Sequence, residues 1–290
     1  MKIENSRLSV EVNPLGAQMT SLYDKQNARE LLWQPRADVW GDQAPLLFPF
    51  VGRLKNERYV YNGRTYHIPI HGFALASRFE AAQESDTAMA FTLRSSDATK
   101  EMYPFDFTLT VRFSLRGDTL LKEHTVKNRG DGPLYYELGG HEGYNLALNA
   151  GEHMAQYALR FDAALVFTHT TDERVMFRPG TAEVPLQNGV LPLSMKTFKD
   201  DALVLDARAG ESATLLDSRG QPVLTVRYAG FPYLGIWTKY LPFDTNYVCI
   251  EPWSSLPDGN YLGGEIEEKE NIRKLEAGAK EMLGYSVKVY

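Results

Sequence analysis

The chain has 290 residues, of which 43% are apolar, and this is enough for one large hydrophobic core or two modest ones. Its net charge of −6 at pH 7 and its pI near 5.6 argue against nucleic acid as the main partner. The single cysteine, Cys249, excludes an intrachain disulfide framework and is typical of a reducing compartment.

Targeting and membrane signals are missing from the sequence. The first residues are polar, with no apolar segment behind them, and this predicts that the protein has no signal peptide. No stretch approaches the about 20 apolar residues of a membrane span. We therefore expect a cytoplasmic protein with no membrane partner.

Alternation between apolar and polar residues marks most of the predicted elements, and this pattern is typical of β-strands. In chain order, strands are predicted at residues 8–12, 59–61, 88–94, 107–113, 119–126, 213–217, 223–228, 247–251 and 285–290. Gly117 and Gly220 lie between neighbouring strands and predict two hairpins. Helical signals are few, with one turn at 194–199 and a weak helix at 265–275. The simplest architecture is one all-β domain over residues 1–290, a large sandwich of antiparallel sheets with few short helices.

Glu251 is the first candidate for chemistry. The strand at 247–251 places Val248 and Ile250 on one face, which we expect to face the core, and Glu251 on the opposite face. Near Tyr247 and Trp253 the carboxylate would be partly desolvated, which would raise its pKa toward that of a useful general base. The alternative is an ordinary surface glutamate at a strand end, and on sequence alone the two interpretations have equal weight.

Two histidines lie beside glycines at the ends of predicted strands. His141 follows Gly139 and Gly140, which would let the backbone turn sharply and let a ligand approach closely. His71 precedes Gly72. Imidazoles titrate near neutral pH, so with a carboxylate they could move protons without a metal or a cofactor. The alternatives, a polar histidine after a turn and a core histidine bonded to a carbonyl, remain open.

Three further side chains could bind a ligand. Arg53 interrupts an apolar run, so it is expected to have a partner carboxylate or a ligand oxygen. Trp237 and Lys239 are expected on the same face of a strand as Gly235, where the indole could form a platform for the apolar face of a sugar. A tryptophan packed in the core is the alternative.

Metal and cofactor motifs are not found in the sequence. His67 and His71 have the four-residue spacing of a helical metal pair, but Pro69 between them excludes that helix. There is no HExxH motif, cysteine pair or carboxylate cluster, and no GxSxG, GxGxxG or Walker loop. We therefore predict no metal and no cofactor.

Several short motifs follow one another along the chain. They are residues 16–17 (GA), 30–34 (ELLWQ), 45–49 (PLLFP), 52–54 (GRL), 71–74 (HGFA), 140–141 (GH), 144–146 (YNL), 232–237 (PYLGIW) and 250–253 (IEPW). In these motifs and their order the chain resembles the aldose 1-epimerase family, and within it the LacX-like branch of galactose mutarotase relatives. The resemblance covers nearly the whole chain, and the ordered set is far more specific than any one motif.

This resemblance implies a galactose mutarotase-like β-supersandwich with a carbohydrate cleft, and cofactor-free interconversion of the α- and β-anomers of an aldose. It implies that Glu251 is the general base for the anomeric hydroxyl and that His141 is the general acid for the ring oxygen. We expect the base and the acid on opposite sides of the ligand. His71 and Arg53 match positions that hold the substrate, and Trp237 would be the stacking wall.

The sequence also departs from the family pattern. The branch commonly has arginine after the His-Gly-Phe-Ala motif, where this chain has Leu75. A proline often follows the second histidine, and here the residue is Glu142, an extra carboxylate close to the expected acid. The substrate-binding aspartate of the family could be Asp200 or Asp201. These departures leave the identity of the substrate open.

Two alternatives to an aldose mutarotase follow. A hexose-6-phosphate mutarotase would need a basic pocket, which Lys239, Arg78 and Arg58 could supply. A carbohydrate-binding or regulatory protein of the same fold would keep the cleft without useful turnover. The expected partner is a monosaccharide or a sugar phosphate, and a monomer and a homodimer are equally compatible with the sequence.

Overall fold

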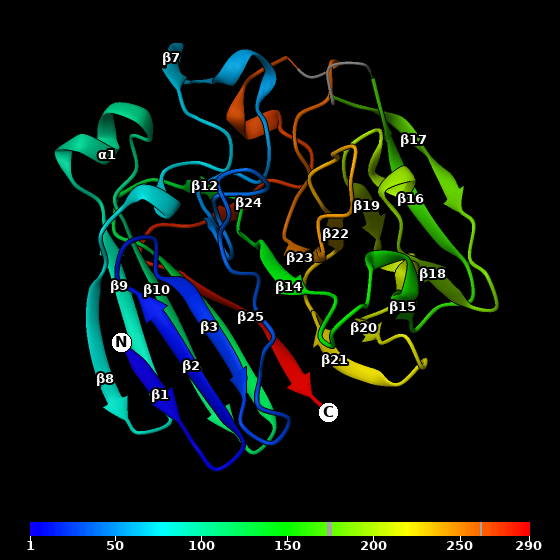
Figure 1. Cartoon of the computed structure of the whole chain (residues 1–290). Helices are drawn as coiled ribbons and strands as arrows, with labels where there is room; N and C mark the ends of the chain where they lie inside the picture. The colour runs from blue at the N-terminus through cyan, green and yellow to red at the C-terminus, as the bar shows by residue number, and fades with distance from the viewer. Residues whose placement is uncertain (173–175, 262) are drawn as a thin grey trace.

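The computed structural model describes residues 1–172, 176–261 and 263–290, and antiparallel β-sheets are its main regular structure (Figure 1). The predicted fold class, an antiparallel β-sandwich with few short helices, is confirmed. Within the described ranges no helix has the length and hydrophobicity needed to cross a membrane.

The largest sheet has nine strands in the described part of the chain. Across the sheet their order is β18 (Val190–Pro192), β15 (Ala158–Phe161), β20 (Ser212–Leu216), β21 (Pro222–Arg227), β25 (Lys280–Val289), β11 (Thr119–Asn128), β10 (Phe107–Arg116), β9 (Ala88–Arg94) and β8 (Glu80–Ser85). The last strand of the chain, β25, lies between β11 and β21 and pairs with both (Figure 1). It therefore joins two groups of strands that are far apart in the sequence.

A second sheet carries the candidate site. Its order is β17 (Phe177–Val184), β16 (Val166–Thr171), β19 (Leu203–Asp206), β22 (Tyr233–Trp237), β23 (Tyr247–Trp253), β13 (Gly139–Gly140) and β5 (Leu46–Leu47), and β14 (Glu142–Asn145) pairs with β23 beside β13.

Smaller elements complete the described structure. A four-stranded sheet, which lies against β9 and β10, contains β1 (Lys2–Glu4), β2 (Leu8–Asn13), β3 (Gln18–Asp24) and β4 (Arg29–Glu30). Two further pairs are β6 (Arg58–Tyr61) with β7 (Arg64–His67), and β12 (Leu134–Tyr136) with β24 (Arg273–Leu275). The helical segments are α1 (Asp97–Met102) and the 3-10 turns Lys55–Glu57, Ala74–Ala76, Met154–Gln156, Met195–Phe198, Ala207–Ala209 and Ile266–Glu268.

The predicted strands are all found, and β9 has the predicted bounds. Both predicted hairpins are present, with Gly117 and Gly220 at positive φ in their turns. The turn expected at 194–199 is the 3-10 turn Met195–Phe198. The helix expected at 265–275 is wrong, because only one 3-10 turn forms there and residues 273–275 pair with β12 instead. The helix α1 was not expected; Ser96 caps it by accepting the backbone N–H of Thr99.

Both faces of β23 are buried. Val248 and Ile250 belong to the main hydrophobic core, as the alternation predicts. Tyr247 and Cys249 lie on the other face and pack in a separate cluster with Trp33 and neighbouring side chains. The face that carries Glu251 is therefore covered by loops of the chain, which explains how a carboxylate at a strand end becomes buried.

Candidate active site

A cavity of about 650 Å³ lies on one face of the second sheet, and this volume falls in the range of about 300–1,000 Å³ that is usual for small-molecule sites. The side chains around it include Trp40, Asp42, Arg53, His71, His141, Asp201, Trp237, Glu251 and Trp253. Of the six predicted site residues, five line this cavity, and Lys239 does not.

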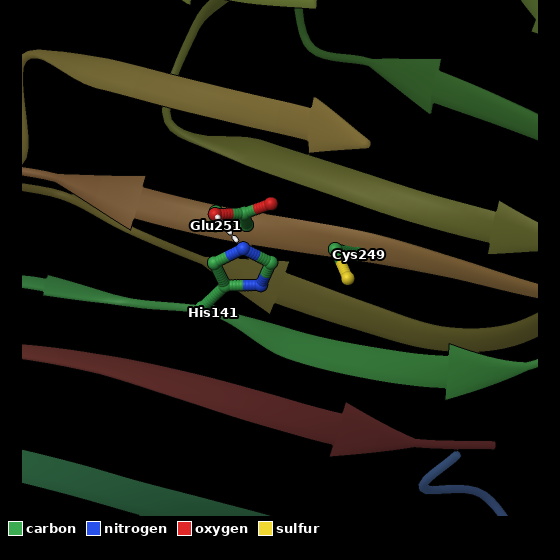
Figure 2. A group of neighbouring side chains, drawn as sticks. All are labelled: His141, Cys249 and Glu251. Carbon is green, nitrogen blue, oxygen red and sulfur yellow. Dashed lines mark ion pairs between the residues drawn. The ribbon is translucent and has the colours of Figure 1, made fainter. Parts of the chain in front are cut away.

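The register of the sheet brings His141 and Glu251 together. Gly139 pairs with Trp253 in the adjacent strand. Two residues further along, this register sets His141 across from Glu251, and the same register continues where β14 pairs with β23. Cross-strand neighbours point to the same face of a sheet, and His141 Nε2 lies 3.4 Å from Glu251 Oε2 (Figure 2). The expectation that the base and the acid lie on opposite sides of a ligand is wrong, since they lie side by side on one wall.

Glu251 is almost completely buried, with 1% of its surface exposed. Burial raises the pKa of its carboxyl well above the ordinary value; the charges of Asp201 and Glu142 act in the same direction, and the indole of Trp253 opposes them. The expected desolvation is confirmed and the alternative of a surface glutamate is wrong. Gly235 lies across from Glu251 in β22, and a Cβ there would come within 2.8 Å of the Trp253 ring. The glycine therefore leaves the space that the Trp253 indole occupies next to Glu251.

His141 is 8% exposed, and its environment favours the neutral ring. Burial lowers the pKa of His141 well below the ordinary value, and His71 nearby lowers it further. Neither His141 Nδ1 nor Glu251 Oε2 has a hydrogen-bond partner among the described residues. A buried polar atom without a partner costs about 1–3 kcal/mol, so these two atoms are among the groups of the site that a polar ligand would satisfy.

The glycines before His141 are needed for packing. A Cβ at Gly140 would lie 2.1 Å from the hydroxyl oxygen of Tyr285, and a Cβ at Gly139 would lie 2.9 Å from the Trp253 ring. The strand therefore passes between side chains that leave no space for one of its own. This reason differs from the sequence interpretation, in which the glycines admit a ligand.

Glu142 points away from His141, into the core, because successive residues of a strand face opposite sides. Its Oε1 accepts hydrogen bonds from Lys122 Nζ and from the hydroxyl of Tyr285, both at 2.6 Å. Lys122 and Glu142 are 1% and 0% exposed, so this is a fully buried ion pair. The extra carboxylate that the sequence places next to His141 is thus neutralised behind the site rather than present in the cavity.

His71 is held by backbone contacts to Gly52. Its Nδ1 accepts the backbone N–H of Gly52 at 3.1 Å, so the proton of the neutral ring is on Nε2. Burial and the charge of Arg53 lower the pKa of His71 to about 4, so the ring is neutral near pH 7. The alternative of a core histidine bonded to a carbonyl is wrong. The ring lies 5.3 Å from that of His141, and it can donate one hydrogen bond at the cavity wall.

Arg53 is exposed at the edge of the cavity. In the described ranges it has no ion pair and no side-chain hydrogen bond, so the carboxylate partner that the sequence suggested is not found there. Its backbone is fixed, because its carbonyl accepts the N–H of Asp258 at 2.8 Å. The guanidinium is therefore available to ligand oxygens.

Aromatic rings form the remaining wall. Trp40 lies 5.2 Å from His141 and stacks on Tyr247 at 5.2 Å, and Trp237 meets His141 edge-on at 5.5 Å. The Trp237 indole donates to Asp201 Oδ1 at 2.7 Å. Trp237 is thus at the cavity wall and not in the core. Sequence reasoning missed Trp40, whose only signal is an aromatic residue in a polar segment ahead of the PLLFP motif.

Comparison with known proteins identifies the family. A family model described as aldose 1-epimerase matches residues 1–266. The chain belongs to the aldose 1-epimerase family.

Individual relatives agree with the resemblance seen in the sequence. Protein LacX (plasmid) of Lactococcus lactis subsp. lactis is 29% identical, over 95% of this chain and 94% of that protein. The structure of a galactose mutarotase related enzyme from Lactobacillus acidophilus superposes with a TM-score of 0.94 at 31% identity, covering 100% of this chain and 97% of that one. A galactose mutarotase-like protein from Lactobacillus casei gives a TM-score of 0.93 at 26% identity, covering 100% and 99%.

In this member of the aldose 1-epimerase family, the predicted site residue Lys239 lies outside the cavity. Strand β22 ends at Trp237, so the alternation that would have carried Lys239 onto the cavity face stops two residues earlier. Its ammonium group is exposed in a neighbouring groove. Arg58 and Arg78 are not in the cavity wall either. Of the two aspartate candidates, Asp201 lines the cavity and Asp200 lines only the groove.

His141, Cys249 and Glu251 also form a cluster of possible metal ligands, with one donor atom of each within 4.8 Å of the others (Figure 2). Thiols and carboxyls bind metals in their deprotonated forms. Burial raises the pKa of the Cys249 thiol and of the Glu251 carboxyl well above their ordinary values, and so favours the protonated forms. The cluster therefore fits proton transfer better than metal binding.

Proposed function

We propose that the protein interconverts the α- and β-anomers of an aldose by general acid/base ring opening. Glu251 takes the proton of the anomeric hydroxyl, the C1–O5 bond breaks as the C1 carbonyl forms, and His141 gives a proton to O5. Rotation about C1–C2 and the reverse transfers give the other anomer. The observation that carries this proposal is the 3.4 Å contact between His141 and Glu251, both buried at the wall of one cavity.

The buried pair of Glu251 and His141 suits this reaction because its neutral form and its ionic form contain the same number of protons. Burial favours a protonated Glu251 with a neutral His141 over a carboxylate with an imidazolium. The reactive ionic form arises when one proton moves from Glu251 to His141, with no exchange with solvent. A sugar hydroxyl and ring oxygen in hydrogen-bonding positions would stabilise that form. Ring opening returns the pair to the neutral form, so burial stabilises the products of the proton transfers.

Other residues would hold the sugar. The Nε2–H of His71 and the guanidinium of Arg53 can donate to sugar hydroxyls, and Asp201 can accept from them. Trp40 and Trp237 offer apolar surface to the ring faces of a pyranose. The chemistry needs only an acid and a base, so the proposed enzyme works without a cofactor.

A neutral aldose fits the cavity better than a sugar phosphate. Among the described residues, the cationic side chain in the cavity wall is Arg53, and the wall also contains Asp42, Asp201 and Glu251. A phosphate needs a clearly basic site, and the arginines and the lysine that could have supplied one lie outside the wall. We therefore place neutral aldoses ahead of hexose 6-phosphates as substrates.

Anomer exchange measured by NMR tests the proposal. Freshly dissolved α-glucose, α-galactose and their 6-phosphates are each mixed with the protein, and the approach to anomeric equilibrium is followed. The proposal predicts faster exchange for at least one neutral sugar. If a folded protein accelerates none of these sugars, the function is binding without turnover, or the substrate is an aldose outside this set, and the proposal for these sugars is wrong.

A further inference from the structure

A second concavity adjoins the cavity that holds the acid/base pair. It is a groove of about 750 Å³, and its wall shares Thr171, Asp201, Ala202 and Trp237 with the wall of the cavity. The hydrogen bond from Trp237 to Asp201 lies at this shared boundary. The cavity and the groove are therefore neighbours that meet at these two side chains.

The groove has the kinds of side chain that bind carbohydrates. Strand β16 contributes Thr168, Thr170 and the half-buried His169, whose Nε2 has no hydrogen-bond partner in the described part of the chain. The loop after β22 contributes Tyr240, which is 52% exposed. Polar groups can orient sugar hydroxyls, and an exposed ring can pack on the apolar face of a pyranose.

The charges of the groove favour an uncharged ligand. Among the described residues its wall contains the carboxylates of Asp172, Asp200 and Asp201 and the ammonium groups of Lys199 and Lys239. Among these residues the positive charges do not outnumber the negative ones, so a phosphate would not meet a basic site there. A hydroxyl both donates and accepts hydrogen bonds, so it can bind to groups of either sign.

The sizes of the two spaces point to more than one sugar unit. A hexose has twelve heavy atoms. A molecule of liquid water occupies about 30 Å³, and if each heavy atom needs no more volume than this, the hexose needs at most about 360 Å³. The cavity of about 650 Å³ accepts one hexose and leaves the groove of about 750 Å³ free. The groove is large enough for a second unit.

We propose that this groove is a subsite for a second neutral sugar unit, so that the preferred substrate is the reducing end of a disaccharide or a longer oligosaccharide. The reducing unit lies in the cavity beside the acid/base pair, and the next unit lies in the groove against Tyr240. This assignment rests on the proposed function, and it names the class of substrate for the same site.

Binding measured without turnover tests the subsite. The variant Glu251→Gln is titrated with glucose, with glucose 6-phosphate and with four glucose disaccharides. The disaccharides are linked through O2, O3, O4 or O6 of the reducing unit, and binding is followed by NMR of the indole N–H signals. At least one disaccharide should bind five times or more as tightly as glucose. Adding Tyr240→Ala should remove about three- to tenfold of this gain and leave glucose binding unchanged. The matched control is Phe243→Ala, which removes a ring that is 48% exposed in the same loop and outside the groove wall, and it should keep the gain.

The outcomes separate the subsite from the proposed function. If no disaccharide binds better than glucose, or if Tyr240→Ala keeps the gain, the subsite is wrong even where the wild type exchanges anomers. If glucose 6-phosphate shows the gain and Lys199→Met removes it, the groove binds phosphate and the subsite is again wrong. If disaccharides show the gain and the wild type accelerates no anomer exchange, the subsite stands and the proposed function fails.

Discussion

The buried ion pair behind the site gives a prediction with a large magnitude. Lys122→Met keeps most of the side-chain volume and removes the ammonium group that lies 2.6 Å from Glu142 Oε1. Both residues are at most 1% exposed, so the carboxylate cannot turn to water. It keeps its hydrogen bond from Tyr285 and loses its only counter-ion in the described structure. Breaking a buried pair in this way costs about 3–5 kcal/mol, and we expect this loss in the free energy of unfolding.

The assay is urea unfolding followed by tryptophan fluorescence at pH 8. The matched control is Lys122→Met with Glu142→Leu, which removes both charges and should recover most of the stability. A loss below about 1 kcal/mol for Lys122→Met, or a double variant no more stable than the single one, would refute the reasoning.

Three further predictions concern the groups around the acid/base pair. Gly140→Ala should lower the free energy of unfolding in urea by about 1–3 kcal/mol and slow anomer exchange, because its Cβ would lie 2.1 Å from Tyr285 and the strand that carries His141 must move. An unchanged free energy of unfolding would contradict the packing argument. Arg53→Met should leave the free energy of unfolding within about 0.5 kcal/mol of wild type, since the exposed guanidinium has no partner in the described residues. The same variant should raise KM about tenfold, because the guanidinium is proposed to bind the sugar, and an unchanged KM would remove Arg53 from the binding site. The pKa of about 4 for His71 lies below the ordinary value, so the unfolded state binds the proton first and the free energy of unfolding should fall as pH drops from about 6.5 to 4. In urea unfolding, His71→Asn should show a shallower fall with pH than the wild type. An equally steep fall would contradict the assignment.

The fold and part of the site follow from local patterns in the sequence. Alternation predicts which face of β23 carries Glu251, because side-chain direction in a strand has a period of two. The same rule fails for Lys239, since the strand ends at Trp237 and the rule says nothing about where a strand ends. The segment at 265–275 fails for another reason: its residues form a strand with β12, and that pairing depends on a segment more than a hundred positions away.

The contact that matters most for function depends on long-range pairing. His141 and Glu251 are far apart in the sequence, and only the register of β13 and β14 on β23 sets them side by side. Trp40 reaches the cavity from a loop that no periodic pattern describes. The role of Glu142 also needed the structure, because its partner Lys122 lies in the other large sheet. Family motifs indicated several of these residues, but not their neighbours.

The central claim is that Glu251 and His141 exchange protons with the sugar. Glu251→Gln keeps the shape of the side chain and removes the base, and the first measurement is NMR anomer exchange by this variant on whichever sugar the wild type accelerates. Cys249→Ser is the matched control, since Cys249 lies on the same buried face of β23 and transfers no proton in the proposed reaction. The account predicts a loss of at least about 100-fold for Glu251→Gln, with sugar affinity within about threefold of wild type, and near-normal exchange for Cys249→Ser. Full exchange by a folded Glu251→Gln would contradict it.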